Sequence, residues 1–391
     1  MNLKIFASFI DGKTTNQIYT LAKTDAFKNS KIRIMPDTHY GKGCVVGFTS
    51  NFTGKLIPNV ISVDIGCGVR VINLGKVEIN LKELDEFIHK FIPSGAEANS
   101  TIQKDFDLTR LHCYKELKNK DVLALQLMSL GGGNHFIELD RDDEGNIYLV
   151  VHTGSRNLGC QVANIYQKKA IKYCHFDVFK NKEMELIAEY KKAKKETKIP
   201  EMLNEYRASC KVNSLPEELC YLEDKDKDDY LHDMKLCQEY AKLNRELICN
   251  KIVKFLKVQK LNEFESVHNY IGNDNIIRKG SISAYKDEKV IIPLNMRDGS
   301  ILGTGLGNED WNFSAPHGAG RSLSRSEAKT LLTLKEYEEQ MKGIYSSTIS
   351  LSTLDESPMA YKDSSNIIEL VKETVKIDKI ILPIYNFKAS E

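Results

Sequence analysis

The sequence predicts an α+β fold, and three observations support that prediction. Short apolar runs rich in β-branched residues alternate with glycine-rich loops toward both ends of the chain. Between them, residues 157–260 are strongly charged and have helical periodicity. No internal repeat or low-complexity linker divides the 391 residues, so we predict a single domain over residues 1–391, with 157–260 as its peripheral helical portion.

The composition excludes several classes of protein. A hydrophobic content of 41% and a charged content of 28% are typical of a soluble globular protein, and no apolar run is long enough for a membrane span. The N-terminus has no signal-peptide pattern, and the nine cysteines form no CxxC pair, so we expect a reducing, cytoplasmic setting. Because the net charge is only +1, any binding of nucleic acid must use a local basic patch.

The first half of the chain contains most of the predicted strands. Residues 31–49 predict a short strand, a Pro-Asp turn, a glycine-rich loop and a second strand. Residues 59–74 predict a buried pair of strands, because apolar β-branched residues flank a polar, glycine-containing centre. A helix is expected at 78–91, where apolar residues recur at helical spacing. Three glycines then lead into a strand at 127–139, which should form a hairpin with the strand at 147–153.

The clearest helix lies at 230–256, where apolar residues recur near a helical period among many charged ones. A helix of this composition is most often a solvated element packed on one face, so we assign it no catalytic role. Further along the chain, strands are expected at 289–294 and 380–385, and a helix is expected at 366–375.

The segment WNFSAPHGAGRSLSR at 311–325 is the strongest candidate for a functional loop. Its glycines allow a close backbone approach or a positive φ, and Ser324 precedes a helix-compatible run, so a helix should begin just downstream. His317 could be a metal ligand, an acid or base, or a nucleophile on phosphorus. It could equally be a structural histidine in a glycine-rich turn, and the segment alone leaves both open.

Five side chains form a candidate metal site. Asp64 and Cys67 interrupt an otherwise apolar stretch, where burying a carboxylate and a thiolate is costly unless a cation compensates them. His135, His152 and His268 each lie at the edge of a strand-like or apolar segment. Taken singly, each could be a hydrogen-bonded core histidine. Together the five could hold one or two divalent ions with a bridging thiolate, and the donor types alone favour zinc over manganese.

Basic residues near these segments could bind phosphate groups. For each one, an ordinary surface ion pair is the competing interpretation. The candidates are Arg156, Arg278, Lys279, Arg321 and Arg325.

Eight motifs, in order along residues 35–363, resemble those of the RtcB-type RNA ligases, and the chain looks like a divergent member. The resemblance implies GTP- and manganese-dependent joining of RNA 2′,3′-cyclic phosphate or 3′-phosphate ends to 5′-hydroxyl ends, in RNA repair or tRNA splicing. It also implies mostly antiparallel sheets that form a metal-binding cleft, with the 157–260 helices outside. The motifs are PDTHYGKG (36–43), DIGCG (64–68), LGGGNHFIEL (130–139), VHTGSRNLG (151–159), HNY (268–270), RKG (278–280), SAPHGAGR (314–321) and AYKD (360–363).

By this resemblance, Cys67 is the ligand shared by two manganese ions. Asp64 and His135 complete the protein ligands of one ion, and His152 and His268 those of the other. The implied partners are RNA with broken ends, GTP and, as for some family members, an accessory activating protein, with no membrane association.

The resemblance also assigns the nucleotide site. His317 becomes the covalent GMP-histidine, and other side chains hold the guanylate. Two departures occur: PLNMRD at 293–298 places Asn295 where many members have a serine, and the chain ends in YNFKASE rather than Lys-Gly, which leaves Lys388 as the substitute lysine. The implied guanylate contacts are Asn134, Phe136, Glu138, Asn295, Ser300, Tyr361 and Lys388.

Two other functions fit the same residues. A binuclear metal-dependent phosphoesterase acting on RNA ends would use the metal ligands but neither GTP nor His317 as a nucleophile. A noncatalytic RNA-end-binding protein would leave both ends unaltered.

Overall fold

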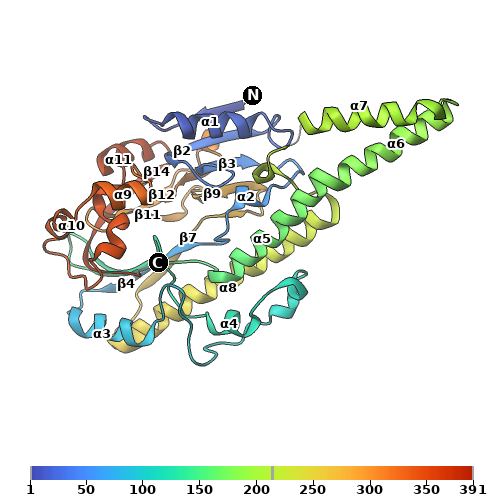
Figure 1. Cartoon of the computed structure of the whole chain (residues 1–391). Coiled ribbons are helices and arrows are strands. Elements are labelled where there is room, and N and C mark those ends of the chain that lie inside the picture. The colour runs from blue at the N-terminus through green and yellow to red at the C-terminus, as the bar shows by residue number, and fades with distance from the viewer. Residues whose placement is uncertain (1, 213–214, 390–391) are drawn as a thin grey trace.

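The computed structural model describes residues 2–212 and 215–389. It has the predicted α+β fold, dominated by a seven-stranded antiparallel sheet (Figure 1). The sheet curves until its two edge strands approach each other, and the backbone N–H of Ile291 on one edge donates to Ser266 Oγ on the other at 3.0 Å. In spatial order its strands are β11 (Lys289–Asn295), β12 (Gly299–Gly305), β14 (Val375–Lys388), β5 (Phe136–Arg141), β6 (Ile147–Thr153), β4 (Gly68–Gly75) and β7 (Asn262–Val267).

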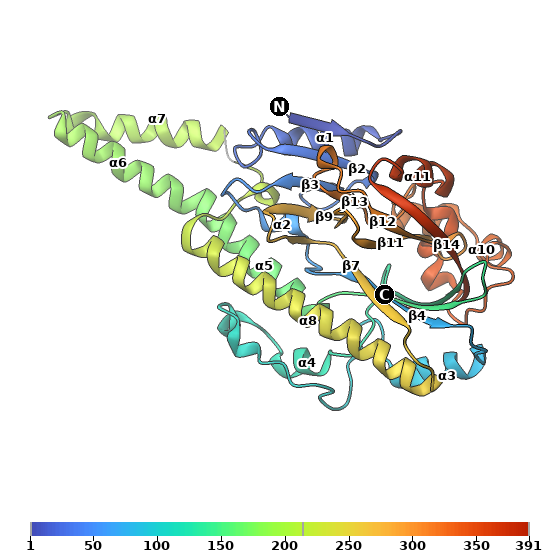
Figure 2. The same ribbon diagram turned by 180° about the vertical axis from the view of Figure 1, so that it is seen from behind.

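A second sheet lies next to the first, on the side where the N-terminus and α1 (Gly12–Ala22) are found (Figures 1 and 2). Only its β1–β2 pair is parallel, and its other pairs are antiparallel. A separate two-stranded sheet pairs β10 (Ser281–Ser283) with β13 (Ser314–Pro316). The five strands of the second sheet are, in spatial order, β1 (Asn2–Ile5), β2 (Lys31–His39), β3 (Val46–Asn51), β9 (Ile276–Lys279) and β8 (Tyr270–Ile271).

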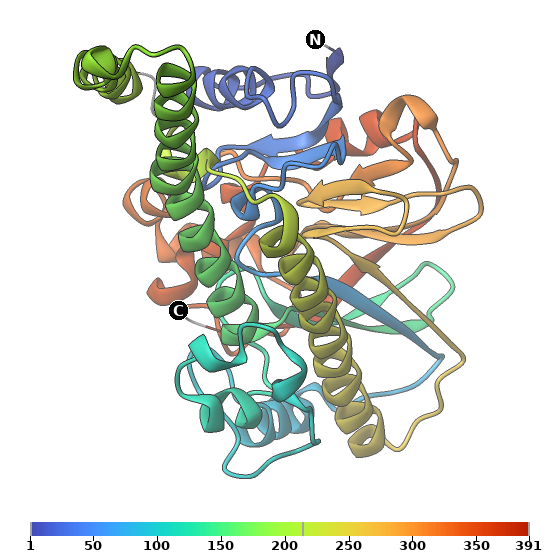
Figure 3. The ribbon, with the colours of Figure 1, turned by 90° about the vertical axis from the view of Figure 1, so that its right-hand side faces the viewer.

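The helices surround these sheets. α5 and α6 continue each other through a short π-helical turn and project from the body, and α7 returns toward it (Figures 1 and 3). α8, by contrast, packs along the body and buries one face against α5, β4 and β6. The helices are α1 (Gly12–Ala22), α2 (Pro58–Ile61), α3 (Leu81–Phe91), α4 (Lys120–Leu125), α5 (Arg156–Lys172), α6 (Val178–Lys192), α7 (Ile199–Val212), α8 (Asp224–Leu256), α9 (Arg325–Leu331), α10 (Leu334–Gln340) and α11 (Ser364–Val371).

Most of the predicted elements are confirmed. The β5–β6 hairpin, the helices at 78–91 and 230–256 and the strands at 289–294 and 380–385 are present. Their bounds differ in places, since β5 begins at Phe136 rather than at 127 and α8 begins at Asp224 rather than at 230. The helix expected after Ser324 begins at Arg325, with Ser324 as its N-cap in a full capping box. No helix of the described residues is long and apolar enough to cross a membrane.

Two local predictions are wrong. Pro36 and Asp37 do not form a turn, because β2 continues through them to His39, with a register shift between Ile34 and His39 that accommodates the missing proline N–H. The stretch before Asp64 is helix α2 rather than a strand. Its four residues are all buried, so their apolar character carries no period that separates helix from strand, and Pro58 favours a helix start.

Candidate active site

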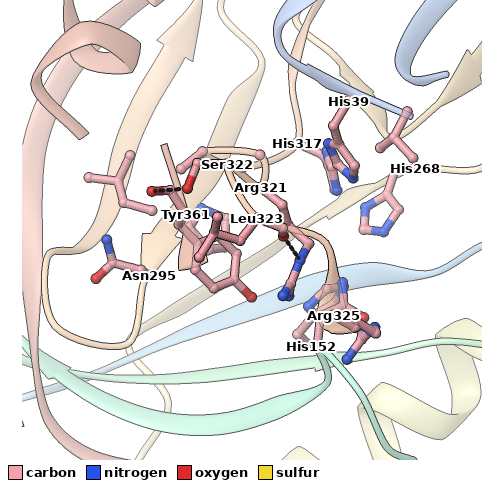
Figure 4. A pocket seen from close by; sticks show the side chains of 18 of the residues that line it. His39, His152, His268, Asn295, His317, Arg321, Ser322, Leu323, Arg325 and Tyr361 are labelled. Carbon is pink, nitrogen blue, oxygen red and sulfur yellow. Dashed lines mark hydrogen bonds between the residues drawn. The ribbon is translucent and has the colours of Figure 1, made fainter. Parts of the chain in front are cut away.

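A cavity of about 750 Å³ opens between the two sheets and the loop that follows β13 (Figure 4). Side chains from both sheets and from the loops at the ends of their strands line it, including Asp64, Cys67, His152, His268 and His317. It therefore contains four of the five predicted metal ligands and the predicted nucleophile. The fifth ligand, His135, is buried immediately behind the wall and contacts Cys67 and Asp64.

The sheet topology explains why residues far apart in sequence meet here. Cys67 directly precedes β4, while His135 precedes β5, and His152 lies near the end of β6 and His268 just past the end of β7. Because β5, β6, β4 and β7 are antiparallel neighbours, the starts of β4 and β5 and the ends of β6 and β7 fall at the same end of the sheet. The register places His152 opposite both Val69 and Phe136.

The five side chains form two groups that share Cys67. One group contains Asp64, Cys67 and His135, and the other contains Cys67, His152 and His268. Within each group the ligand atoms lie within 4.8 Å of one another. The Sγ atom is 3.3 Å from His135 Nε2 and 3.2 Å from His152 Nε2, and His135 Nε2 is 3.0 Å from an oxygen of Asp64.

The electrostatics of the cluster fit divalent cations. Burial lowers the pKa of His152 and His268 well below the ordinary value, so both rings are neutral and can donate a lone pair. Burial, and then the charge of Asp64, raises the pKa of the Cys67 thiol. Burial would also raise the pKa of Asp64, but His135 lowers it to about 2. A cation would stabilise the thiolate in this setting and compensate the buried carboxylate.

Two further details bear on that fit. His135 Nδ1 lies 3.0 Å from the carbonyl of Leu130, which orients the ring so that Nε2 faces the thiol. Within the described residues, Nδ1 of His152 is buried without a hydrogen-bond partner. The donor set of one thiol, three imidazoles and one carboxylate could thus hold a metal ion in either group.

Arg245 of α8 supports the backbone on which this cluster is built, and no pattern in the sequence predicts that role. Its guanidinium is 1% exposed and donates to the carbonyls of Gly66 and Thr153, both at 2.9 Å, and to Glu265 at 3.1 Å. Gly66 and Thr153 each adjoin a predicted ligand. Arg245 therefore holds the segments that carry Cys67 and His152 at a fixed separation.

We expect Arg245→Leu to destabilise the protein by about 3–5 kcal/mol, because it leaves buried carbonyls and Glu265 without their cation. Denaturant unfolding followed by circular dichroism measures this loss. Arg110→Leu is the matched control, since Arg110 forms a half-exposed ion pair with Glu239 and should cost less than about 1 kcal/mol. Equal effects of the two substitutions would contradict the role given to Arg245.

His317 is oriented by Asp37, which was not among the predicted site residues. His317 Nδ1 lies 2.7 Å from Asp37 Oδ2, and Asp37 is fully buried. An Nδ1–H that donates to the carboxylate leaves Nε2 with its lone pair free. The His317 ring also lies 4.7 Å from the ring of His268, so it adjoins the metal-type cluster (Figure 4).

The loop around His317 packs tightly against β2. Gly320 has φ +75°, and a Cβ there would lie 2.0 Å from the carbonyl oxygen of Asp37. Lys362 Nζ donates to the carbonyls of Pro36 and Thr38, at 3.1 and 2.6 Å, on either side of Asp37. The glycine in this motif is therefore required by a close approach to protein backbone.

His39 is a second cavity residue that the predicted site omitted. It is the last residue of β2, and both it and His317 line the cavity (Figure 4). Its Nδ1 is 3.0 Å from the Asp37 carbonyl, and burial lowers the pKa of His39 to about 4. Both Asp37 and His39 belong to the PDTHYGKG motif, which is the sequence signal that could indicate them.

The predicted guanylate contacts divide into two groups. Six of them line the cavity, whereas Ser300 is buried on β12 opposite Pro293, and its hydroxyl has no hydrogen-bond partner within the described residues. Burial raises the pKa of Glu138 to about 7, while Lys388 and Asn386 act in the opposite direction. The six that line the cavity are Asn134, Phe136, Glu138, Asn295, Tyr361 and Lys388.

Lys388 is held in the cavity wall by Glu356, another residue that the predicted site omitted. The two are both buried, and Lys388 Nζ lies 3.1 Å from Glu356 Oε2. Glu356 also accepts from the hydroxyl of Tyr361 at 2.6 Å. Burial would raise the pKa of Glu356, but the charges of Lys388, Arg325 and Arg321 hold it at about 2.

The structure also places the predicted basic residues. Arg321, Arg325 and Lys279 line the cavity, whereas Arg156 and Arg278 do not. Arg321 and Arg325 pair with Glu356 at 3.3 and 2.7 Å, and Lys279 donates to two backbone carbonyls. The PLNMRD departure also has a local role, since Asn295 donates to Asp298 at 2.8 Å and Asp298 pairs with Arg297.

The fold and the site together define an α+β protein in which a metal-type ligand cluster lies beside a carboxylate-oriented histidine. Comparison with known families is specific: residues 17–115 and 112–389 match the family described as tRNA-splicing ligase RtcB. The chain belongs to this family. The family resemblance and the prediction of an RNA ligase are thereby confirmed.

Individual relatives match over most of their length. The RNA-splicing ligase RtcB of Escherichia coli (strain K12) is 28% identical over 413 residues, which cover 94% of this chain and 92% of that protein. The tRNA-splicing ligase RtcB of Methanococcus maripaludis is 28% identical over 432 residues, covering 87% and 84%. That of Thermococcus kodakarensis is 28% identical over 432 residues, covering 87% and 83%.

Proposed function

We propose that this RNA ligase joins RNA ends bearing a 2′,3′-cyclic phosphate or 3′-phosphate to 5′-hydroxyl ends, through a covalent GMP-histidine at His317. The observation that carries the proposal is the pairing of His317 Nδ1 with buried Asp37, beside a cluster of metal-type donors. We further propose that residues 1–391 act as one catalytic domain. Its physiological setting is RNA repair or tRNA splicing, with an accessory activating protein as a further proposed partner.

The proposed reaction begins at His317 Nε2. Its lone pair attacks the α-phosphorus of GTP, so that a P–N bond forms and the bond to pyrophosphate breaks. Asp37 stabilises the positive charge that the ring acquires. An oxygen of the RNA 3′-phosphate, reached from a cyclic end after hydrolysis, then attacks the same phosphorus and displaces the histidine. Attack of the 5′-hydroxyl on the activated 3′-phosphate finally releases GMP and a proton.

The metal ligands in this proposal are Asp64, Cys67, His135, His152 and His268, with Cys67 shared. Two divalent manganese ions bound there would neutralise phosphate oxygens and lower the charge repulsion between nucleotide and RNA. Manganese rests on the family resemblance, because the donor types by themselves favour zinc.

Incubating the protein with manganese and GTP labelled at its α-phosphate tests the proposal. We expect a covalent label that is stable to alkali and lost in acid, as the P–N bond of a phosphoramidate requires. Unlabelled protein that still opens cyclic phosphates without GTP would favour the binuclear phosphoesterase instead. Unaltered RNA ends after long incubation would favour a noncatalytic end-binding protein.

Glu138 gives a prediction for the pH dependence of GTP binding. A guanine edge donates hydrogen bonds, so it requires the ionised carboxylate as acceptor. Because burial raises this carboxyl pKa to about 7, the group becomes protonated as the pH falls below 7. We expect the affinity for GTP, measured by calorimetry, to fall about tenfold per pH unit below that point.

Glu138→Gln should remove this pH dependence and weaken the preference for GTP over ATP. The matched control is Glu144→Gln, in the turn after β5, which should leave both properties unchanged. A pH profile of GTP binding that is the same in wild type and Glu138→Gln would exclude Glu138 as the guanine acceptor.

A further inference from the structure

A basic groove runs along one side of α5, away from the cavity described above. It has a volume of about 600 Å³ and separates α5 from the loop at 116–119. Lys168, Lys169 and Lys172 of α5 line it together with Lys118 of the loop, and among the described residues in its wall Glu116 is the only carboxylate. The net charge of the whole chain is +1, so this concentration of lysines is a local feature.

Most of this positive charge is uncompensated. Lys169 Nζ pairs with Glu116 at 2.9 Å. Within the described residues, the ammonium groups of Lys118, Lys168 and Lys172 have no carboxylate or other hydrogen-bond partner. Three free cations in one groove repel one another and attract a polyanion, whose binding releases counterions from its phosphates.

Two hydrogen bonds hold the loop side of the groove against α5. The side-chain oxygen of Gln161 accepts from the backbone N–H of Lys118 at 2.8 Å, and its amide nitrogen donates to the carbonyl of Lys118 at 3.1 Å. These two hydrogen bonds to the backbone of one residue fix the loop against the helix. Asn157 and Asn164 add amide groups to the wall, and amides can hydrogen-bond to ribose hydroxyls and base edges.

The position of α5 connects the groove to the active site. The backbone N–H of Ser155, which precedes the helix, donates to Asp64 at 3.2 Å. From Asn157 to Lys172 the helix rises about 22 Å, at about 1.5 Å per residue. Figures 1 and 3 show the segment that leads into α4 lying beside α5. The groove therefore begins near the metal-type cluster and extends away from it.

We infer that this groove binds the sugar-phosphate backbone of single-stranded RNA, several nucleotides from the reacting end. The inference rests on the proposed function, because that function makes RNA the ligand. The groove itself contributes to binding RNA and takes no part in the reaction. Lysines that contact phosphates contribute binding without strong sequence preference, which suits a ligase that acts on ends of differing sequence.

The double variant Lys168→Glu/Lys172→Glu tests this inference, with the full chain and a fluorescent single-stranded RNA that ends in a 3′-phosphate. We expect its RNA affinity, measured by anisotropy, to fall at least tenfold at about 0.1 M salt. The slope of log affinity against log salt should become smaller by about 1.4, or about 0.7 for each lost phosphate contact. Covalent labelling by GTP should remain at the wild-type level.

The matched control is Lys191→Glu/Lys192→Glu, which makes the same charge change at exposed positions of α6, about 30 Å beyond Lys172 along the helical rod. It should leave RNA affinity within about twofold of wild type. Unchanged RNA binding by the groove variant, or equal losses in both variants, would overturn the inference. Failure of the wild type to label with GTP would instead contradict the proposed function, and the RNA-binding comparison would still stand on its own.

Discussion

Asp37→Asn is expected to slow the guanylation of His317 by about 10²–10⁴-fold, and His317→Ala should abolish it. Asparagine can still accept a hydrogen bond from Nδ1–H, but it cannot stabilise the imidazolium that forms when Nε2 attacks phosphorus. The carboxylate is fully buried and 2.7 Å from the ring, so solvent screens this interaction little. The measurement is the rate of covalent labelling with α-labelled GTP.

Two controls separate this role from a structural one. Asp37 belongs to neither metal-type group, so Asp37→Asn should keep the wild-type manganese content and GTP affinity while the rate at saturating GTP falls. Asp107→Asn, at an exposed helix cap outside the cavity lining, should change neither quantity. A weaker GTP affinity with an unchanged labelling rate would show that Asp37 binds nucleotide rather than orienting His317.

Cys67→Ser is expected to lower the affinity for manganese at both positions by more than 100-fold. Its thiol is the one donor common to both groups, and loss of a residue that merely orients a ligand already costs about 10–100-fold. A serine hydroxyl in the same place is harder to deprotonate and is a poorer bridging ligand. Calorimetric titration with manganese, together with metal analysis of the dialysed protein, measures the loss.

Cys160→Ser is the matched control, because Cys160 is a half-buried free thiol on α5 outside both groups. It should bind metal as the wild type does. Cys67→Ser protein that retains one ion at wild-type affinity would contradict a shared thiolate and assign Cys67 to a single metal.

Several elements were predictable because their signals are local. The hairpin β5–β6 follows from apolar runs on both sides of a turn, and α8 follows from apolar residues at helical spacing. The helix start after Ser324 follows from a serine that precedes a helix-compatible run. The prediction of a strand before Asp64 was wrong because the local signal there is ambiguous. A short segment buried on all sides has no polar face, so α2 and a buried strand have the same pattern in the sequence.

By itself, the sequence determined the donor types, the motifs and the α+β class, because each depends only on which residues are present and on their spacing along the chain. Tertiary structure alone decided which atoms meet: Asp37 with His317, Arg245 with the backbone beside Cys67, and Glu356 with Lys388. These contacts join positions far apart in the chain, and strand order and register set them. Neither order nor register leaves a mark at the single residues involved.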